Sequence, residues 1–355
     1  MKRILPFTLV GIALLLPQPA RACTIPVFRY ALEKWDLTPA EVLVFHNGPL
    51  PKELDETLKL FGEFPNKLNL EINRINLAGK VAPKVMKLWE REGKKDQGPW
   101  MLIRYAGADP TEPSAFNGPC NLANLKSIAD SPLRQAVLAH LARGTSVVYV
   151  QVTSDDRKAD EAIHALLTSE LATLERKIKL PVQSDSGPKL QLPLPLKVSF
   201  TLLVLDRNKA EEAGFLSLLL GTEERLLTMK GPIVFPIFGR GRVLGSLCAA
   251  KKEITDDQIL EVTKFLCREC SCQIKDLNPG LDMVMTAEWR KMFDRLFDGK
   301  EAMAMPKDLP TMLPAAPKKS SALPFSRDAQ SVVRQPIIDA DSACAPPRIT
   351  AKRLG

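Results

Sequence analysis

Short apolar strands alternate with amphipathic helical segments along most of this chain, and the alternation limits the possible fold more than any other feature. Residues 41–46 form an apolar run with β-branched and aromatic side chains, and residues 68–77 alternate apolar and polar side chains, as in a strand with one covered face. Apolar residues recur at helical spacing between these runs and before a third strand at residues 100–105. A β-α-β-α-β order predicts an α/β fold in which helices pack on a central mixed sheet.

The second half of the chain repeats this order. Residues 146–152 and 197–205 are predicted strands, and a long amphipathic helix is predicted between them. In each half a Gly-Pro dipeptide directly precedes an apolar strand, Gly98-Pro99 in the first half and Gly231-Pro232 in the second. The shared order predicts two α/β domains in tandem.

Three local patterns give further expectations. Thr153, with Asp156 three residues later, predicts a capping box at the start of the long helix. Arg240 and Arg242 flank a glycine in a predicted hairpin turn, where we expect them at a solvated tip. Residues 106–130 are rich in Gly, Pro, Asn and Ser, so we expect an irregular connection there.

The start of the chain has the pattern of an export signal. Lys2 and Arg3 precede an apolar run at residues 4–16, and Ala20-Arg21-Ala22 places small residues at both recognition positions of a cleavage site. The apolar run is shorter than the about 20 residues that a spanning helix needs. We therefore expect residues 1–22 to be a secretory signal peptide and the mature protein to reach the periplasm or the outer face of the membrane.

Cys23 follows the predicted cleavage point and has two interpretations. Bacterial lipoproteins carry their lipid on a cysteine in this position, and lipidation would leave six cysteines, an even number, for disulfides. However, Ala20 stands where a lipoprotein signal usually has Leu, and Arg21 stands where it has a small residue. Cleavage by ordinary signal peptidase fits equally well, and a lipid on Cys23 is the one membrane contact that we expect.

The distribution of charged residues and prolines distinguishes the C-terminal part of the chain from the rest. The formal charge is +8, and half of it lies in residues 306–355, which carry eight Lys or Arg and four Asp. The remaining charges are mixed in sign, so we expect no nucleic-acid partner. The same fifty residues hold eight prolines, which predicts a disordered tail. The expected division is a signal peptide at 1–22, α/β domains at 23–130 and 131–300, and a Pro-rich tail at 301–355.

Residues 40–107 resemble a thioredoxin-like domain. The segment His46-Asn47-Gly48-Pro49-Leu50 resembles the Trp-Cys-Gly-Pro-Cys segment that follows the first core strand of that family, and Gly98-Pro99 resembles the place where a cis-proline introduces the strand beside the active site. The chain departs from the family at Asn47 and Leu50, which occupy the positions of the two redox cysteines. Disulfide exchange needs a thiolate, so the resemblance implies this fold without its redox chemistry.

The second half has a weaker resemblance to the same family. Its active-site position would be Thr153-Ser154-Asp155-Asp156, which also lacks cysteine. The resemblance therefore implies two tandem, degenerate thioredoxin-like domains.

Cys267, Cys270 and Cys272 form a dense cysteine cluster with three open interpretations. They can form structural disulfides with partners such as Cys248 or Cys120, because exported cysteines usually oxidise. Thiolates at this spacing can also bind Cu or Zn, and Cys270 with Cys272 can be a thiol-disulfide redox pair.

These observations favour a binding or structural role over catalysis. The sequence has no phosphate loop, serine-hydrolase elbow or zinc-protease motif. We expect an exported component of the cell envelope whose partner is an unidentified envelope protein. The alternatives are a Cu- or Zn-binding protein and a thiol-disulfide oxidoreductase that uses Cys270 and Cys272.

Overall fold

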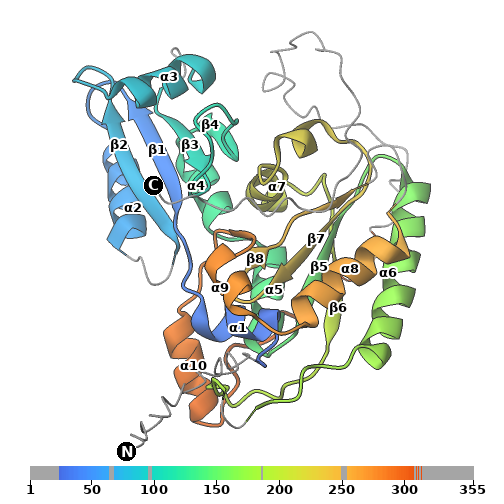
Figure 1. Ribbon diagram of the computed structural model, residues 1–355. Helices are drawn as coiled ribbons and strands as arrows, with labels where there is room; N and C mark the ends of the chain where they lie inside the picture. Colours follow the sequence, from blue (N-terminus) through green and yellow to red (C-terminus); the bar gives the residue numbers. More distant parts are fainter. Residues whose placement is uncertain are drawn as a thin grey trace, which may run out of the picture.

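The computed structural model has an α/β fold with two mixed β-sheets flanked by helices (Figure 1). It describes residues 24–63, 68–94, 98–184, 187–248 and 254–307, together with residues 309, 311 and 313. The predicted signal peptide, Cys23 and most of the predicted tail lie outside the described residues. Within the described residues, no helix combines the length and the apolar character needed to span a bilayer.

The first sheet has four strands in the order β2-β1-β3-β4. Strands β1 and β2 are parallel, whereas β3 is antiparallel to both of its neighbours, β1 and β4. Helix α2 connects β1 to β2, helix α3 connects β2 to β3, and helix α4 follows β4. The bounds of these elements are β1 Ala40–His46, α2 Lys52–Glu63, β2 Leu70–Asn76, α3 Pro83–Glu92, β3 Trp100–Arg104, β4 Phe116–Pro119 and α4 Leu122–Ala129.

The second sheet repeats this arrangement in its central strands, in the order β6-β5-β7-β8. Strands β5 and β6 are parallel, and β7 is antiparallel to β5 and β8. Strand β9 also pairs with β7, and β10 extends the sheet beyond β8. The bounds are β5 Val147–Val152, α6 Arg157–Lys177, β6 Phe200–Leu205, α7 Ala213–Leu220, β7 Ile233–Phe238, β8 Arg242–Val243, β9 Leu247–Cys248, α8 Asp256–Cys267 and β10 Leu281–Asp282.

The helices cover the two sheets in the same way. In the first unit α2 and α4 pack on one face of the sheet and α3 packs on the other. In the second unit α6 and α8 share one face, and α7 lies on the opposite face together with α5, Pro132–Ala142. The largest core cluster contains Val42 and Met101 of the first sheet and Val150 and Phe235 of the second. One continuous core therefore connects the two sheets.

Helix α7 provides the closest contact between the units. The Gly214 amide donates to Ser127 Oγ at 2.8 Å, and Tyr105 Oη donates to the Leu218 carbonyl at 2.7 Å. A Cβ on Gly214 would lie 2.4 Å from the backbone oxygen of Ser127, well inside van der Waals contact. Glycine at this position lets α7 approach α4 directly.

Helix α1, Val27–Lys34, precedes the first sheet in sequence but packs on the second. Its Val27, Phe28 and Ala31 side chains join the cluster that contains Tyr149 of β5 and Phe238 of β7. The start of the predicted first domain therefore completes the core of the second unit.

A buried ion pair in α1 holds the proline-rich segment that follows α6. Arg29 Nε donates to Glu33 Oε1 at 2.7 Å, and Arg29 Nη2 donates to the carbonyls of Leu192 and Leu194. Glu33 in turn accepts hydrogen bonds from the Gln191 and Leu192 amides. Buried charges need such partners, and here the partners fix a segment whose described residues form no strand or helix.

The C-terminal segment passes from the second sheet to the first. After α9, Cys272–Leu277, and β10, the buried residues 283–285 run beside Asn69 and lead to α10, Trp289–Phe297. The Asn69 side chain donates to the Met283 carbonyl at 3.0 Å and accepts from the Met285 amide at 2.9 Å. One buried amide thus pairs with the backbone of this segment much as a neighbouring strand would.

The structure corrects the expectation for the hairpin turn. Arg242 is buried, with its side chain 3% exposed, and it forms a bidentate ion pair with Asp282 through Nε at 2.9 Å and Nη2 at 2.7 Å. The Thr38 amide also donates to Asp282, and the Trp35 ring stacks on the Arg242 guanidinium. Arg240 is also mostly buried and donates to backbone carbonyls at the end of α1. Neither arginine lies at a solvated tip.

Two other expectations are wrong. Residues 106–130 contain β4 and α4 rather than an irregular connection, because pairing with β3 orders β4 and the Asn121 side chain caps α4. Asp156, rather than Thr153, is the N-cap of α6 and accepts from the amides of Lys158 and Ala159. Thr153 Oγ1 instead accepts from the Arg207 amide.

The Arg242–Asp282 pair gives a test of the fold. Arg242→Ala would leave a buried carboxylate without its cation, and we expect the free energy of unfolding to fall by about 3–5 kcal/mol. Denaturant titration followed by circular dichroism measures this change. The control is Arg157→Ala, which removes an ion pair with Glu161 whose two side chains are about half exposed, and it should change stability little. Equal effects of the two substitutions would contradict this role of the buried pair.

Candidate functional site

The segment after β1 lies where the family resemblance places an active site. His46 is the last residue of β1, and its Nδ1 lies 2.6 Å from the Gly48 carbonyl oxygen, with which it hydrogen-bonds. Gly48 has a φ of 76°, a left-handed conformation that favours glycine. Phe45 pairs with Trp100 of the antiparallel strand β3, and Pro99 directly precedes β3. The register of β1 and β3 thus places His46 and Pro99 at the same end of the sheet.

The side chains in this segment offer little chemistry. Asn47 is exposed, and Leu50 packs against the shared core. Pro49 is also exposed, and the described residues contain no cis peptide bond, so Pro99 is trans. Pro99 therefore differs from the family's cis-proline in this respect. No thiol follows β1 in this segment, so no group in it can attack a disulfide.

The corresponding end of the second sheet is occupied by a hydrogen-bonded polar cluster. Asp160 accepts from the Ser154 amide at 2.9 and 3.0 Å and from Ser154 Oγ at 2.8 Å. Burial raises the pKa of Asp160, against the lowering effect of these hydrogen bonds. Arg207 Nε donates to the Thr153 carbonyl at 2.9 Å, and burial lowers the pKa of Arg207. These contacts fix the start of α6.

Two cysteines outside the cluster at residues 267–272 lie near these sheet ends. The Cys120 amide donates to the Pro99 carbonyl at 2.8 Å, and Cys248 pairs with Ile233, directly after Pro232. Burial raises the pKa of Cys120 to about 12, whereas Cys248 Sγ lies 2.9 Å from Arg225 Nη1. Each unit therefore places a buried cysteine beside its Gly-Pro strand. The sequence has no clear signal for this, because β4 has poor strand preference and β9 has only two residues.

The cysteine cluster is divided by burial. Cys267 ends α8 and Cys270 lies in the following turn, both with almost no exposed surface, whereas Cys272 begins α9 and is exposed. Burial raises the pKa of Cys267 to about 12, so its thiol stays protonated at neutral pH. A protonated, buried thiol is a poor nucleophile.

Neither the disulfide nor the metal interpretation gains support from the geometry. No disulfide joins two of the described cysteines, Cys120, Cys248, Cys267, Cys270 and Cys272. In the described part of the chain, no group of three or more His, Cys, Asp or Glu side chains is arranged to hold a metal ion. Structural disulfides and binding of Cu or Zn both stay predictions.

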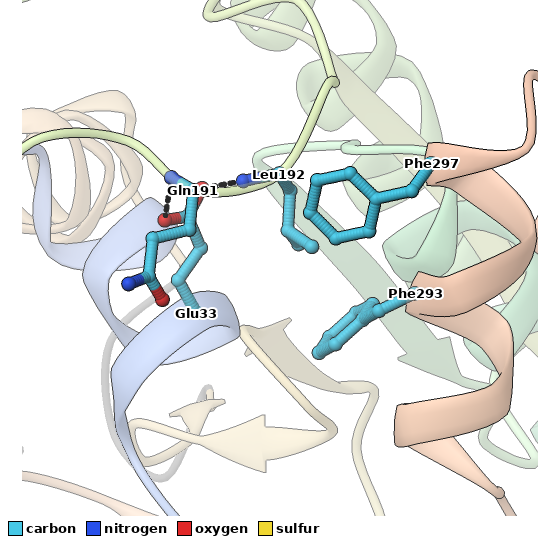
Figure 2. Close-up of a pocket in the computed structure, with 5 residues that line it drawn as sticks. All are labelled: Glu33, Gln191, Leu192, Phe293 and Phe297. Carbon is cyan, nitrogen blue, oxygen red and sulfur yellow. Dashed lines mark hydrogen bonds between the residues drawn. The ribbon is translucent and has the colours of Figure 1, made fainter.

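A small hollow lies between α1, the proline-rich segment and α10 (Figure 2). It has a volume of about 370 Å³. Its walls are Glu33, Gln191, Leu192, Phe293 and Phe297. Figure 2 shows the Glu33 carboxylate turned toward the backbone amides of Gln191 and Leu192, with both phenylalanine rings on α10 facing it across the hollow. The carboxylate is already satisfied, so the hollow offers mainly an apolar surface.

A larger groove runs between α6 and α8 on the second unit, where Figure 1 shows these helices side by side. Its volume is about 1060 Å³. We call it the α6–α8 groove, and it is bordered by residues 170–181 and 256–269. Its size is close to the 300–1000 Å³ typical of small-molecule sites.

Comparison with models of known protein families finds no match for this chain, and no curated protein matches its sequence.

Differences in burial predict different thiol reactivities. In the folded protein at about pH 8, we expect an alkylating reagent to modify Cys272 and to leave Cys267 unmodified, because about one Cys267 thiol in ten thousand would be ionised. Peptide mass spectrometry after a timed reaction measures both sites. Cys267 should become reactive once the protein is denatured. Equal rates at the two sites in the folded protein would contradict the assignment.

Proposed function

We propose that this chain is an exported cell-envelope protein built from two thioredoxin-like units without redox chemistry, and that it acts as a binding or structural component. The observation that carries the proposal is the shared strand order of the two sheets. In each, a parallel strand pair is followed by two antiparallel strands, with the first and third helices on one face and the second on the other. The alternation of strands and helices on which the family resemblance rests is present in both units.

The sheet ends support the loss of redox function. In the first unit, the positions of the redox cysteines are held by Asn47, which is exposed, and by Leu50, which is half-buried against the core. In the second unit, Ser154 and Asp160 hydrogen-bond to each other at the same place. Disulfide exchange requires a thiolate within reach of a disulfide sulfur, and neither segment supplies one.

The envelope location rests on the sequence. Residues 1–22 have the pattern of a secretory signal peptide, and Cys23 fits either a lipidated or an unmodified mature N-terminus. The partner that we propose is another envelope protein, with no role for nucleic acid. A lipid on Cys23 would be the sole attachment to the membrane.

An insulin-reduction assay tests the proposed loss of redox function. We expect the purified mature protein, with dithiothreitol present, to reduce insulin no faster than dithiothreitol alone. A Cys270→Ser/Cys272→Ser variant should behave identically, since these positions have no part in the proposal. Reduction by the unmodified protein that disappears in this variant would establish a thiol-disulfide oxidoreductase instead. The matched variant Cys120→Ser/Cys248→Ser tests in the same assay whether the two buried cysteines beside the Gly-Pro strands contribute to insulin reduction.

Export can be tested separately. Expression of the full chain in a bacterium and intact-mass measurement of the envelope fraction should give a protein that begins at Cys23, with or without the added mass of a lipid. Recovery of the uncleaved chain from the cytoplasm would contradict the envelope assignment.

A further inference from the structure

The α6–α8 groove has an apolar floor that the core of the second unit leaves partly exposed. Ile178, Leu180, Leu260 and Phe265 line it, and each packs against the buried cluster without being fully covered. Helix α8 has twelve residues and is therefore about 18 Å long. The groove extends along the whole of α8, so its floor is elongated rather than round.

Four cations gather at one end of this groove. Lys177 and Lys179 lie at the end of α6, and Lys264 and Arg268 lie at the end of α8. All four are exposed, and none forms an ion pair with another described residue. The Arg268 guanidinium lies over the Phe265 ring at 4.6 Å, which places a charge directly at the edge of the apolar floor.

The segment that follows α6 and the end of α8 both hydrogen-bond to the residues around the start of α1. Thr24 accepts hydrogen bonds from the Gln183 side chain and the Ser184 amide, shortly after α6. Three residues later, the Val27 amide donates to the Arg268 carbonyl at the end of α8. The four cations line the groove at the C-terminal ends of its two helices, and the acidic residue Glu269 directly follows Arg268.

The acidic residues that line the groove come earlier in the two helices than the cations. Asp256 and Asp257 lie in the first turn of α8, Glu261 lies about one turn before Lys264, and Glu170 lies about two turns before Lys177. Along each helix the charge thus changes from negative to positive, and the apolar residues Ile178, Leu180 and Phe265 lie next to the cations. An elongated ligand with one negative end would bind in a single orientation, with its charged group at the cations.

We propose that the α6–α8 groove binds an anionic amphiphile, a single acyl chain with a carboxylate or phosphate headgroup. The acyl chain lies on Ile178, Leu180, Leu260 and Phe265, and the headgroup lies among Lys177, Lys179, Lys264 and Arg268. This site is on the helical face of the second unit, away from the sheet ends, and it does not depend on the proposed loss of redox function.

The dimensions favour a small molecule over a protein partner. A stable protein interface buries about 800 Å² on each partner, commonly with large apolar residues at its centre. The groove offers four partly exposed apolar side chains within a volume suited to one ligand. Long cationic side chains can place their methylene groups over an acyl chain while their charges meet the headgroup.

Fluorescence titration with a dansylated undecanoic acid tests the proposal on the mature protein. We expect saturable binding, with displacement by dodecanoate and much weaker displacement by dodecanol, which lacks the charge. The variant Lys264→Gln/Arg268→Gln should bind the probe roughly tenfold more weakly, because it loses two of the four cations. Leu260→Asn should also weaken binding by making the floor polar.

Controls separate these effects from general changes in charge or folding. Lys84→Gln/Lys87→Gln removes two exposed cations from α3 and should leave binding unchanged. Thermal unfolding of each variant shows whether it remains folded, since Lys264 also lies in the last turn of α8, where a cation stabilises the helix.

Three outcomes would overturn the proposal. These are no saturable signal up to about 50 µM probe, equal binding by the groove and control variants, or equal displacement by dodecanoate and dodecanol. Binding of the protein to anionic phospholipid vesicles, without binding of the free probe, would indicate that this face contacts a membrane surface. That result would also reject the proposed site.

Discussion

The buried ion pair between Arg242 and Asp282 connects three distant parts of the chain. Arg242 belongs to β8, Asp282 belongs to β10, and the amide of Thr38, just before β1, also donates to Asp282. Because the charges are out of contact with water, their geometry is strongly constrained. The entry to the first sheet and the edge of the second sheet are consequently fixed to the same carboxylate. The C-terminal segment then continues to Asn69, which adds a second polar attachment between the units.

Periodicity alone predicted the regular part of this architecture. The apolar runs at β1, β5 and β7 are buried throughout or nearly so, and such runs favour strands wherever they occur in a sequence. The start of α8 likewise depends on a local contact, the capping box between Thr255 and Gln258, which are three positions apart. Local patterns were sufficient to predict these elements. Their stabilising contacts either join residues close in sequence or require only that the side chains be apolar.

The predictions that were wrong concern residues whose hydrogen-bond or ion-pair partners are distant in sequence. Arg242 has the sequence context of a turn tip, but its partner Asp282 lies forty residues later. Strand β4, Phe-Asn-Gly-Pro, has poor intrinsic strand preference, and its pairing with β3 determines its conformation. The candidate site shows the same limit. The sequence located both sheet ends, but the α6–α8 groove depends on the relative placement of two helices about eighty residues apart in sequence.

The position of α1 also determines when the second unit can be completed during synthesis. Helix α1 is the first described element to be made, and yet it packs against α8, Asp256–Cys267, which is made more than two hundred residues later. Contacts between such distant segments form late, because the intervening chain must be closed into a loop first. Until α8 is available, the apolar side chains of Val27 and Phe28 have no complete surface to cover them. A chain shortened before α8 would therefore expose a hydrophobic segment at its beginning rather than at its cut end, where a protease or chaperone would find it.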